Sequence, residues 1–276
     1  MKIKVISSFV CVVLMAVLVL TSACSRGSGN QGGSAGSYTI EVGGSTSVTP
    51  LMELFAAEYE NVKPNIKVNI SGTGSGDGIT NAGVTYQIGM SSRELTAAEL
   101  GRGLRVETVA IDGIAIIVNS NNSVSNLSVD QVRSIYTGEI TNWSQVGGRS
   151  ATIAVVSREE GSGTRGAFEE IVGFQGRLLA NANQLTSTGA ILANINQNQD
   201  AIGYISLGSV NDTIKALSVG GVAATPANVV NGSYRVARPF IVLTGNNVHA
   251  ESAAFVEWML SSAGQNIVRR SWIPVR

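Results

Sequence analysis

From Tyr38 to the C-terminus, short apolar runs alternate with longer segments whose apolar residues recur at helical spacing. Short runs rich in Val and Ile and bounded by Gly, Ser or Asn are typical of strands. Strands that alternate with helices predict an α/β fold with largely parallel sheets. The expected strands are Tyr38–Val42, Ile66–Ile70, Gln87–Met90, Val106–Val118, Thr152–Val156, Ala201–Ile205 and Pro239–Leu243.

Local start signals support the helices between these strands. Thr96 with Glu99, and Ser128 with Gln131, have the spacing of a capping box. Pro50 suits the first position of a helix, where its missing N–H costs nothing. Helices are therefore expected to begin near Thr49, Gly76, Thr96, Ser128, Thr164, Gly189 and Ala250.

The apolar run Thr108–Asn119 is too long for one ordinary strand, and we interpret it as a crossing from one lobe into a second. Arg238–Thr244 would return the chain to the first lobe. The expected first lobe is 38–118 plus 237–276, and the expected second lobe is 119–236. A ligand cleft is expected between them, because open α/β sheets bind ligands at the carboxyl ends of their strands.

The N-terminal segment has the features of an export signal. Lys2 and Lys4 precede the apolar run Val10–Leu20, and small residues lead to Cys24. This order of a positive start, an apolar run and small residues before a cysteine predicts a signal peptide over 1–23 and a lipid anchor on Cys24, which would be acylated. Thr21 stands where such lipoprotein signals usually carry Leu, so a plain secretory signal or an uncleaved anchor is the alternative.

Residues 24–37 are almost entirely Gly, Ser, Asn, Gln and Ala, a composition that predicts a flexible tether. Cys11 and Cys24 are the only cysteines, so a disulfide framework or thiolate metal site is excluded from the body. We expect an exported protein that is anchored by its lipid to the outer face of the cell membrane, or that lies in the periplasm. We expect it to bind no metal and no cofactor.

Charge excludes one class of partner. The chain has 19 Lys and Arg residues and 19 Asp and Glu residues, so its formal net charge is zero. The sequence has no clustered run of Lys and Arg of the kind that is typical of nucleic-acid binders. Any anion must therefore be bound by local groups and not by the overall field of the protein.

Three clusters of Gly, Ser and Thr each follow an expected strand and precede an expected helix: Gly43–Ser47, Gly72–Gly76 and Gly161–Thr164. The first turn of a helix exposes unpaired N–H groups, and Gly lets an anion approach them closely. One such turn alone is more often a helix cap than a ligand site. Three that face one cleft could enclose a dehydrated oxyanion with little formal charge nearby.

Arg158 supplies a cation beside the third cluster. It ends an expected strand four residues before Ser162, so its guanidinium can reach the same pocket. Glu160 is expected to hold Arg158 by a bidentate pair, with a solvated surface pair as the alternative.

Five blocks together resemble one protein family, the PstS family of phosphate-binding receptors of bacterial ABC importers. They are Ser157–Arg165, Gly43–Pro50, Gly72–Gly78, Ile88–Arg93 and Ile135–Trp143. The resemblance extends from about Tyr38 to the C-terminus. It implies a type II periplasmic-binding-protein fold, two α/β lobes joined by two crossover segments, that closes over inorganic phosphate and delivers it to a membrane permease with a cytoplasmic ATPase behind it.

The resemblance also implies the phosphate-binding residues: Thr46, Ser47, Ser75, Arg158, Ser162, Gly163 and Thr164. Ser92 adds a departure, because many family members have Asp there to accept the proton of hydrogen phosphate. A serine hydroxyl can accept that hydrogen bond without repelling a fully deprotonated anion, which puts selectivity against sulfate in question. Asp112 or Asp77 is the alternative acceptor.

Other classes are less well supported. A hydrolase needs a base, and His249 is far in sequence from every Gly/Ser turn. No nucleophile elbow or phosphate-binding loop with Gly-Lys-Ser/Thr occurs. Two alternatives remain open: a receptor of the same fold for sulfate, molybdate or tungstate, and an adhesin or signalling module with a vestigial anion site.

Overall fold

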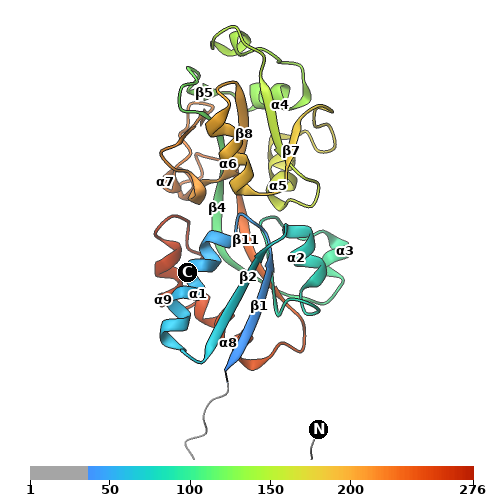
Figure 1. Cartoon of the computed structure of the whole chain (residues 1–276), viewed down its shortest axis with the longest axis vertical. Helices are drawn as coiled ribbons and strands as arrows, with labels where there is room; N and C mark the ends of the chain where they lie inside the picture. Colours follow the sequence, from blue (N-terminus) through green and yellow to red (C-terminus); the bar gives the residue numbers. More distant parts are fainter. Residues whose placement is uncertain (1–36) are drawn as a thin grey trace, which may run out of the picture. The chain divides into compact units, whose positions relative to one another are not determined.

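The run expected to cross between lobes forms one strand, β4 (Arg105–Asn119), in the computed structural model, which describes residues 37–276. The first part of β4 pairs with β11 (Ala237–Thr244), and its last part pairs with β8 (Ala201–Ser206). In Figure 1, β4 and β11 lie side by side at the waist between the two lobes. The predicted crossing and return are therefore confirmed.

The first lobe is built on the strand order β2-β1-β3, followed by β11 and β4. The parallel strands are β1 (Tyr38–Gly44), β2 (Ile66–Gly72) and β3 (Ile88–Ser91). Its helices are α1 (Thr49–Val62), α2 (Ser75–Asn81), α3 (Ala97–Leu100), α8 (Ala250–Met259) and α9 (Ser262–Val268).

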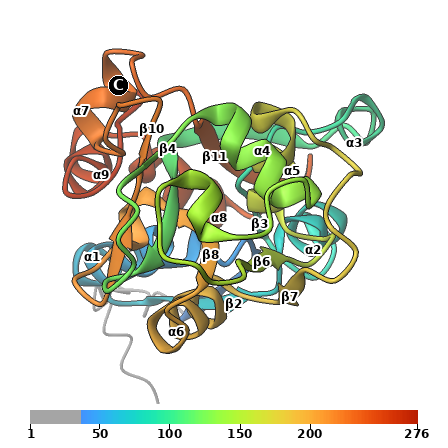
Figure 2. The same cartoon turned by 90° about the horizontal axis from the view of Figure 1, so that it is seen from above.

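The second lobe continues the sheet through β8, β6 (Ala154–Arg158) and β7 (Asn183–Leu185), with β9 (Ile214–Ala216) on β4. Figure 2 shows α4 (Val129–Thr137) and α5 (Gly163–Val172) on one side of these strands and α6 (Thr188–Gln197) on the other. The remaining elements are β5 (Asn126–Leu127), β10 (Ser218–Val219), α7 (Pro226–Val230) and the short 3₁₀ helices η1 (Trp143–Val146) and η2 (Leu207–Ser209).

Separate apolar cores fill the two lobes. Val109 and Ala110 pack in the core of the first lobe, whereas Ile114, Ile116 and Val118 pack in that of the second. The change of lobe therefore falls within β4, before the limit at residue 118 that the sequence suggested.

The expected strands and helices are present, with ends shifted by at most a few residues, and both capping boxes form. The expectation of largely parallel sheets is wrong at the centre of the molecule. There β11 pairs antiparallel with both β3 and β4, and β4 pairs antiparallel with β8. The crossing strand β4 and the returning strand β11 pass through the waist in opposite directions.

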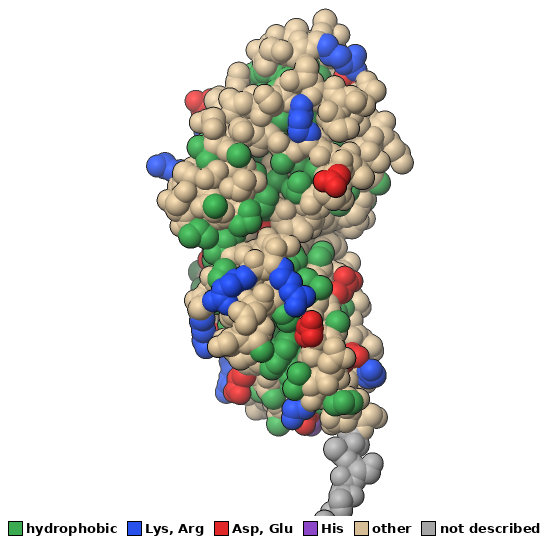
Figure 3. Space-filling view, turned by 90° about the vertical axis from the view of Figure 1, so that its left-hand side faces the viewer, with side chains coloured by type: hydrophobic (Ala, Val, Ile, Leu, Met, Phe, Trp, Pro, Cys, Tyr) green, Lys and Arg blue, Asp and Glu red, His purple; other side chains and the backbone are tan. Residues whose placement is uncertain are grey.

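The surface shows no single dominant charge. On the face in Figure 3, cationic and anionic side chains are interspersed over both lobes. Within residues 37–276, no helix is long and apolar enough to cross a membrane. The expected signal peptide (1–23), the lipid anchor on Cys24 and most of the tether (24–37) lie outside the described residues.

Candidate functional site

The three Gly/Ser/Thr turns meet where the two lobes touch. Ser47 Oγ, at the start of α1, lies 2.7 Å from Thr164 Oγ1 of α5. The backbone N–H of Gly76 in α2 donates to the carbonyl oxygen of Gly161 across the same boundary, at 3.0 Å. Turns from opposite lobes, far apart in sequence, are thus in direct contact.

Glycine at position 163 is required by this contact. A Cβ atom there would lie 2.3 Å from Ser75 Oγ and 2.9 Å from Ser92 Oγ, distances too short for any side chain. The first turn of α5 therefore approaches the hydroxyls of the first lobe backbone-first, the arrangement that leaves its N–H groups available to an anion.

Buried hydroxyls of the first lobe form a directed chain. Ser47 N–H donates to Ser45 Oγ at 3.3 Å, and Ser45 Oγ donates to Ser92 Oγ at 2.8 Å. Ser92 N–H donates to Ser75 Oγ at 3.1 Å, and the oxygens of Ser75 and Ser92 are 3.3 Å apart. Either hydroxyl can be the donor between Ser75 and Ser92, and when Ser92 donates, the proton of Ser75 can point toward a ligand.

Arg158 is buried, with its side chain 2% exposed, and most of its guanidinium is held in place. Nε and Nη2 each donate to a carboxylate oxygen of Glu159 at 2.8 Å. The same two nitrogens donate to the carbonyl oxygens of Leu185 and Thr186 at 3.2 and 3.3 Å. Nη1 has no partner within the described part of the chain, which leaves that nitrogen as the donor available to an anion.

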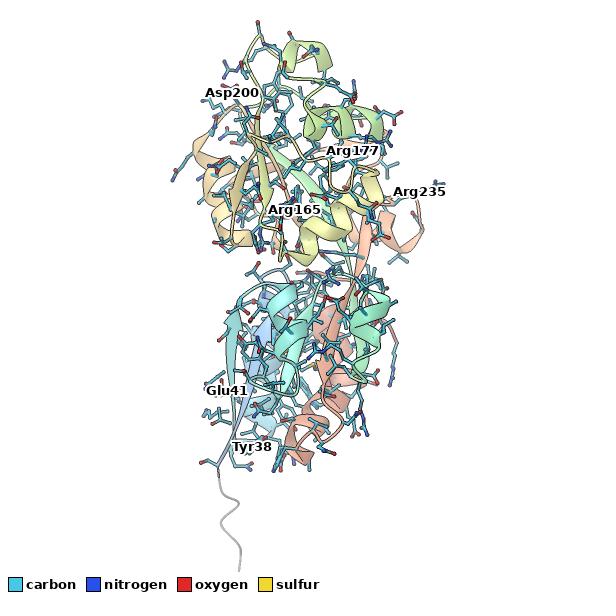
Figure 4. The ribbon with its side chains drawn as sticks, turned by 90° about the vertical axis from the view of Figure 1, so that its right-hand side faces the viewer. Tyr38, Glu41, Arg165, Arg177, Asp200 and Arg235 are labelled. Carbon is cyan, nitrogen blue, oxygen red and sulfur yellow. The ribbon has the colours of Figure 1, made fainter. Side chains whose placement is uncertain are left out.

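Arg165 and Ser162 make hydrogen bonds at the start of α5, close to Arg158 in the second lobe. Arg165, labelled in Figure 4 at the end of this lobe that faces the first, donates to the carbonyl oxygen of Arg158 at 3.1 Å and pairs with Glu169 at 2.6 Å. Ser162 caps α5, its Oγ accepting from the N–H of Arg165. The hydroxyl proton of Ser162 therefore remains available for a ligand.

Behind Ser92, the two crossing strands carry a buried ion pair. Asp112 of β4 stands opposite Arg238 of β11, and its Oδ2 accepts from the guanidinium at 3.2 and 3.3 Å. Ser206 donates to Asp112 Oδ1 at 2.8 Å, and Arg238 Nη1 donates to the carbonyl oxygen of Ser92 at 3.1 Å. Burial raises the pKa of Asp112 to about 6, although the charge of Arg238 and the bond from Ser206 oppose this rise.

This arrangement suits a small tetrahedral anion. Donors converge from both lobes, one guanidinium nitrogen is available, and each hydrogen bond to a charged group contributes about 1.5–3 kcal/mol. Within residues 37–276, no group of three or more His, Cys, Asp or Glu side chains is placed to hold a metal ion.

Comparison with known proteins identifies the family. A family model described as a PBP superfamily domain matches residues 29–263. The phosphate-binding protein PstS of Borreliella burgdorferi is 30% identical over 242 residues, which cover 83% of this chain and 87% of the relative. The chain belongs to the PstS family.

Solved structures agree with this assignment. A Clostridium perfringens protein named as a phosphate ABC transporter substrate-binding protein, with bound phosphate, is 44% identical, with a TM-score of 0.85 over 87% of this chain and 100% of that one. An ABC-type phosphate transport receptor from Vibrio cholerae is 35% identical, with a TM-score of 0.71 over 86% of this chain and 100% of that one. The two-lobed periplasmic-binding-protein architecture is thereby confirmed.

In this PstS-family chain, the expected partner of Arg158 is wrong. Glu159, not Glu160, forms the bidentate pair. β6 ends at Arg158 and the chain turns at Glu160 and Gly161, which turns the exposed Glu160 carboxylate to solvent.

Asp77 is also not in the hydroxyl cluster. Its carboxylate accepts from Thr73 at 2.5 Å, Asn81 at 2.7 Å and Tyr86 at 2.8 Å, all within the first lobe. These bonds, that from Thr73 above all, hold the pKa of Asp77 below its ordinary value. Both carboxylate oxygens of Asp112 already accept hydrogen bonds from Arg238 and Ser206. This geometry favours a role for Asp112 in holding the site residues over a role as acceptor of the proton of hydrogen phosphate.

His249 lies apart from the cluster, as expected from its place in the sequence. It is exposed, accepts from the N–H of Glu251 at the start of α8, and stacks on Tyr38 with ring centroids 4.0 Å apart. Figure 4 places Tyr38 at the end of the first lobe that points away from the second. Its two partners, Glu251 and Tyr38, are not among the expected site residues.

Three residues of the cluster were missed by the sequence argument: Ser45, Thr188 and Arg238. Ser45 belongs to a turn that had been singled out, but its role depends on Ser92. Thr188 begins α6 and lies 3.3 Å from both Thr46 Oγ1 and Ser47 Oγ. The Ser-Thr-Gly sequence at 187–189, before an expected helix, was the available signal for Thr188.

Proposed function

We propose that this PstS-family protein is the extracytoplasmic phosphate receptor of an ABC importer, which binds inorganic phosphate between its lobes and delivers it to the membrane permease. The observation that carries the proposal is the convergence of the Ser47, Ser75 and Thr164 turns around Gly163. In the second lobe, Nη1 of the buried Arg158 has no hydrogen-bond partner among residues 37–276. Relatives named as phosphate-binding proteins and a relative with bound phosphate support it.

The chemistry of the site explains the choice of ligand class. Phosphate must lose its water on binding, and fixed N–H and O–H donors replace that water without rearrangement. The charges of Arg158 and Glu159 nearly cancel, so the anion binds where the local net charge of the protein is close to zero. We assign Thr46, Ser47, Ser75, Ser92, Arg158, Ser162, Gly163 and Thr164 to the phosphate site.

The route of delivery belongs to the same proposal. The similar solved structures are named as a phosphate ABC transporter substrate-binding protein and an ABC-type phosphate transport receptor. We infer that a lipid on Cys24 anchors the protein to the outer face of the membrane, and that permease subunits with a cytoplasmic ATPase receive the phosphate. Replacement of Cys24 by Ser should move the protein from the membrane fraction to the soluble fraction, and unchanged fractionation would contradict the anchor.

Ser92 gives one specific reason to consider another oxyanion. Its neutral hydroxyl lacks the charge with which an aspartate would repel a fully deprotonated anion such as sulfate or molybdate. Such a receptor would use the same donors and the same closure of the lobes.

Calorimetry on the full chain in detergent tests the proposal. Phosphate should bind with a Kd in the low micromolar range or tighter, about −8 kcal/mol or more favourable. Sulfate and molybdate are titrated in parallel and in competition. Heat from sulfate or molybdate without heat from phosphate would reassign the ligand, and no heat from any of the three would remove the receptor function.

A further inference from the structure

A contact between the lobes involves a residue that the phosphate site does not include. Thr188, the first residue of α6 in the second lobe, is 6% exposed and faces the first turn of the first lobe. Its Oγ1 lies 3.3 Å from Thr46 Oγ1 and 3.3 Å from Ser47 Oγ, and its N–H donates to Thr46 Oγ1 at 3.4 Å. One side chain thus joins two residues assigned to phosphate.

The segment that leads into Thr188 also holds the cation of the site. The carbonyl oxygens of Leu185 and Thr186 accept from Nε and Nη2 of Arg158. Ser187 then caps α6 by accepting from the N–H of Ala190 at 3.1 Å. Because the backbone is fixed on both sides, Thr188 is presented to the first lobe in one orientation, while Arg158 is held by the residues just before it.

The hydroxyl of Thr188 is committed to the protein. Both of its close neighbours are hydroxyls of the other lobe, and Ser47 also contacts Thr164 at 2.7 Å. These bonds exist only while α6 and the start of α1 are together. When the lobes open, the hydroxyls of Thr188, Thr46 and Ser47 return to water. These hydrogen bonds therefore stabilise only the closed state.

We propose that Thr188 is a positioning residue that latches the closed lobes and slows release of the anion, without contacting the anion itself. The inference rests on the proposed function, since it assigns a further determinant to the same site. The anion enters while the lobes are apart, so the latch acts on dissociation and not on association.

Stopped-flow and calorimetric binding of phosphate to the full chain in detergent tests the latch in Thr188→Val, which keeps the shape and the backbone N–H. The expected result is a dissociation rate raised roughly fivefold to tenfold, as for the loss of one or two ordinary hydrogen bonds. The association rate should stay within about twofold of that of the unchanged chain. Thr152→Val is the matched control, because Thr152 is exposed in the same lobe and its side chain makes no hydrogen bond within the described residues.

A double-mutant cycle with Thr46→Val separates a latch from direct contact with the anion. If Thr188 acts through Thr46, its substitution should change the dissociation rate much less in the Thr46→Val background. An effect on association alone, or no effect in either background, would overturn the latch, and an equal effect in both backgrounds would assign it to Ser47, whose Oγ is also 3.3 Å from Thr188 Oγ1. If the unchanged chain binds no phosphate, the proposed function fails first; if it binds and Thr188→Val behaves like Thr152→Val, only the latch fails.

Discussion

At the scale of single residues, Arg158 depends on the planar shape of its side chain. Two of its nitrogens each donate to a carboxylate oxygen and a carbonyl oxygen at once, and the third has no partner among residues 37–276. A lysine keeps the charge but cannot form this fork. Arg158→Lys should therefore weaken phosphate binding by about 2 kcal/mol or more, roughly thirtyfold in Kd.

Calorimetry compares this variant with Arg149→Lys. Arg149 pairs with Asp200 on the surface, where its side chain is 58% exposed, and the same change there should leave the affinity unaltered. Equal affinities of the two variants would show that Arg158 does not contact the anion.

Gly163 tests the close approach of the lobes. In Gly163→Ala, the new Cβ would meet Ser75 Oγ at 2.3 Å and Ser92 Oγ at 2.9 Å, so the lobes cannot close as they do here. We expect phosphate binding to fall by at least about a hundredfold, with the melting temperature of the ligand-free protein nearly unchanged. Gly161→Ala is the control, because a Cβ there has nothing within 4 Å. Wild-type affinity in Gly163→Ala would contradict the proposed site.

At the scale of elements, the sequence predicted those with strong periodicity and missed those without it. β4 and β11 were expected because a continuous apolar run cannot stay in water. β7 (Asn183–Leu185) and β10 (Ser218–Val219) are short and partly polar, and they exist only because a neighbouring strand offers hydrogen bonds. α7 was missed although Thr225 and Pro226 form an ordinary helix start.

The site divides in the same way. The turns at Ser47, Ser75 and Thr164 could be predicted, because each follows a strand and precedes a helix. Arg238 could not, since its role depends on Ser92, more than 100 residues away, which only the antiparallel waist brings near. Thr188 carried a local signal, Ser and Gly beside it before an expected helix, but its partners Thr46 and Ser47 lie in the other lobe and only the closed lobes bring them near. The prediction that Glu160 pairs with Arg158 was wrong because sequence spacing does not reveal the turn that follows β6.

The waist strands are expected to depend on the pair that joins them. Asp112→Ala leaves Arg238 as a buried cation without its carboxylate, which should lower the free energy of unfolding by about 3–5 kcal/mol. Asp200→Ala breaks the exposed pair with Arg149 and should cost about 0–1 kcal/mol. Urea denaturation of both variants measures the difference, and equal losses would mean that Asp112 and Arg238 contribute no more than a surface pair.

At the scale of the whole molecule, the same carboxyl links stability to pH. Burial raises the pKa of Asp112 from 3.8 to about 6 in the folded protein. Between these values the folded state keeps a proton that the unfolded chain has already released. The stabilisation from this proton is therefore complete below pH 3.8 and is lost as the pH rises through about 6.

Asp112→Asn removes this dependence, because the amide does not titrate. The free energy of unfolding of the unchanged chain, minus that of the variant, should be larger near about pH 4 than near about pH 7.5, by at most about 3 kcal/mol. Glu99 acts in the opposite direction, since Arg93 lowers its pKa to about 2, but it is present in both proteins and cancels. Urea titrations at the two pH values without phosphate measure the difference. A difference that is constant with pH, or larger at the higher pH, would mean that the Asp112 carboxyl is ionised throughout this range in the folded waist.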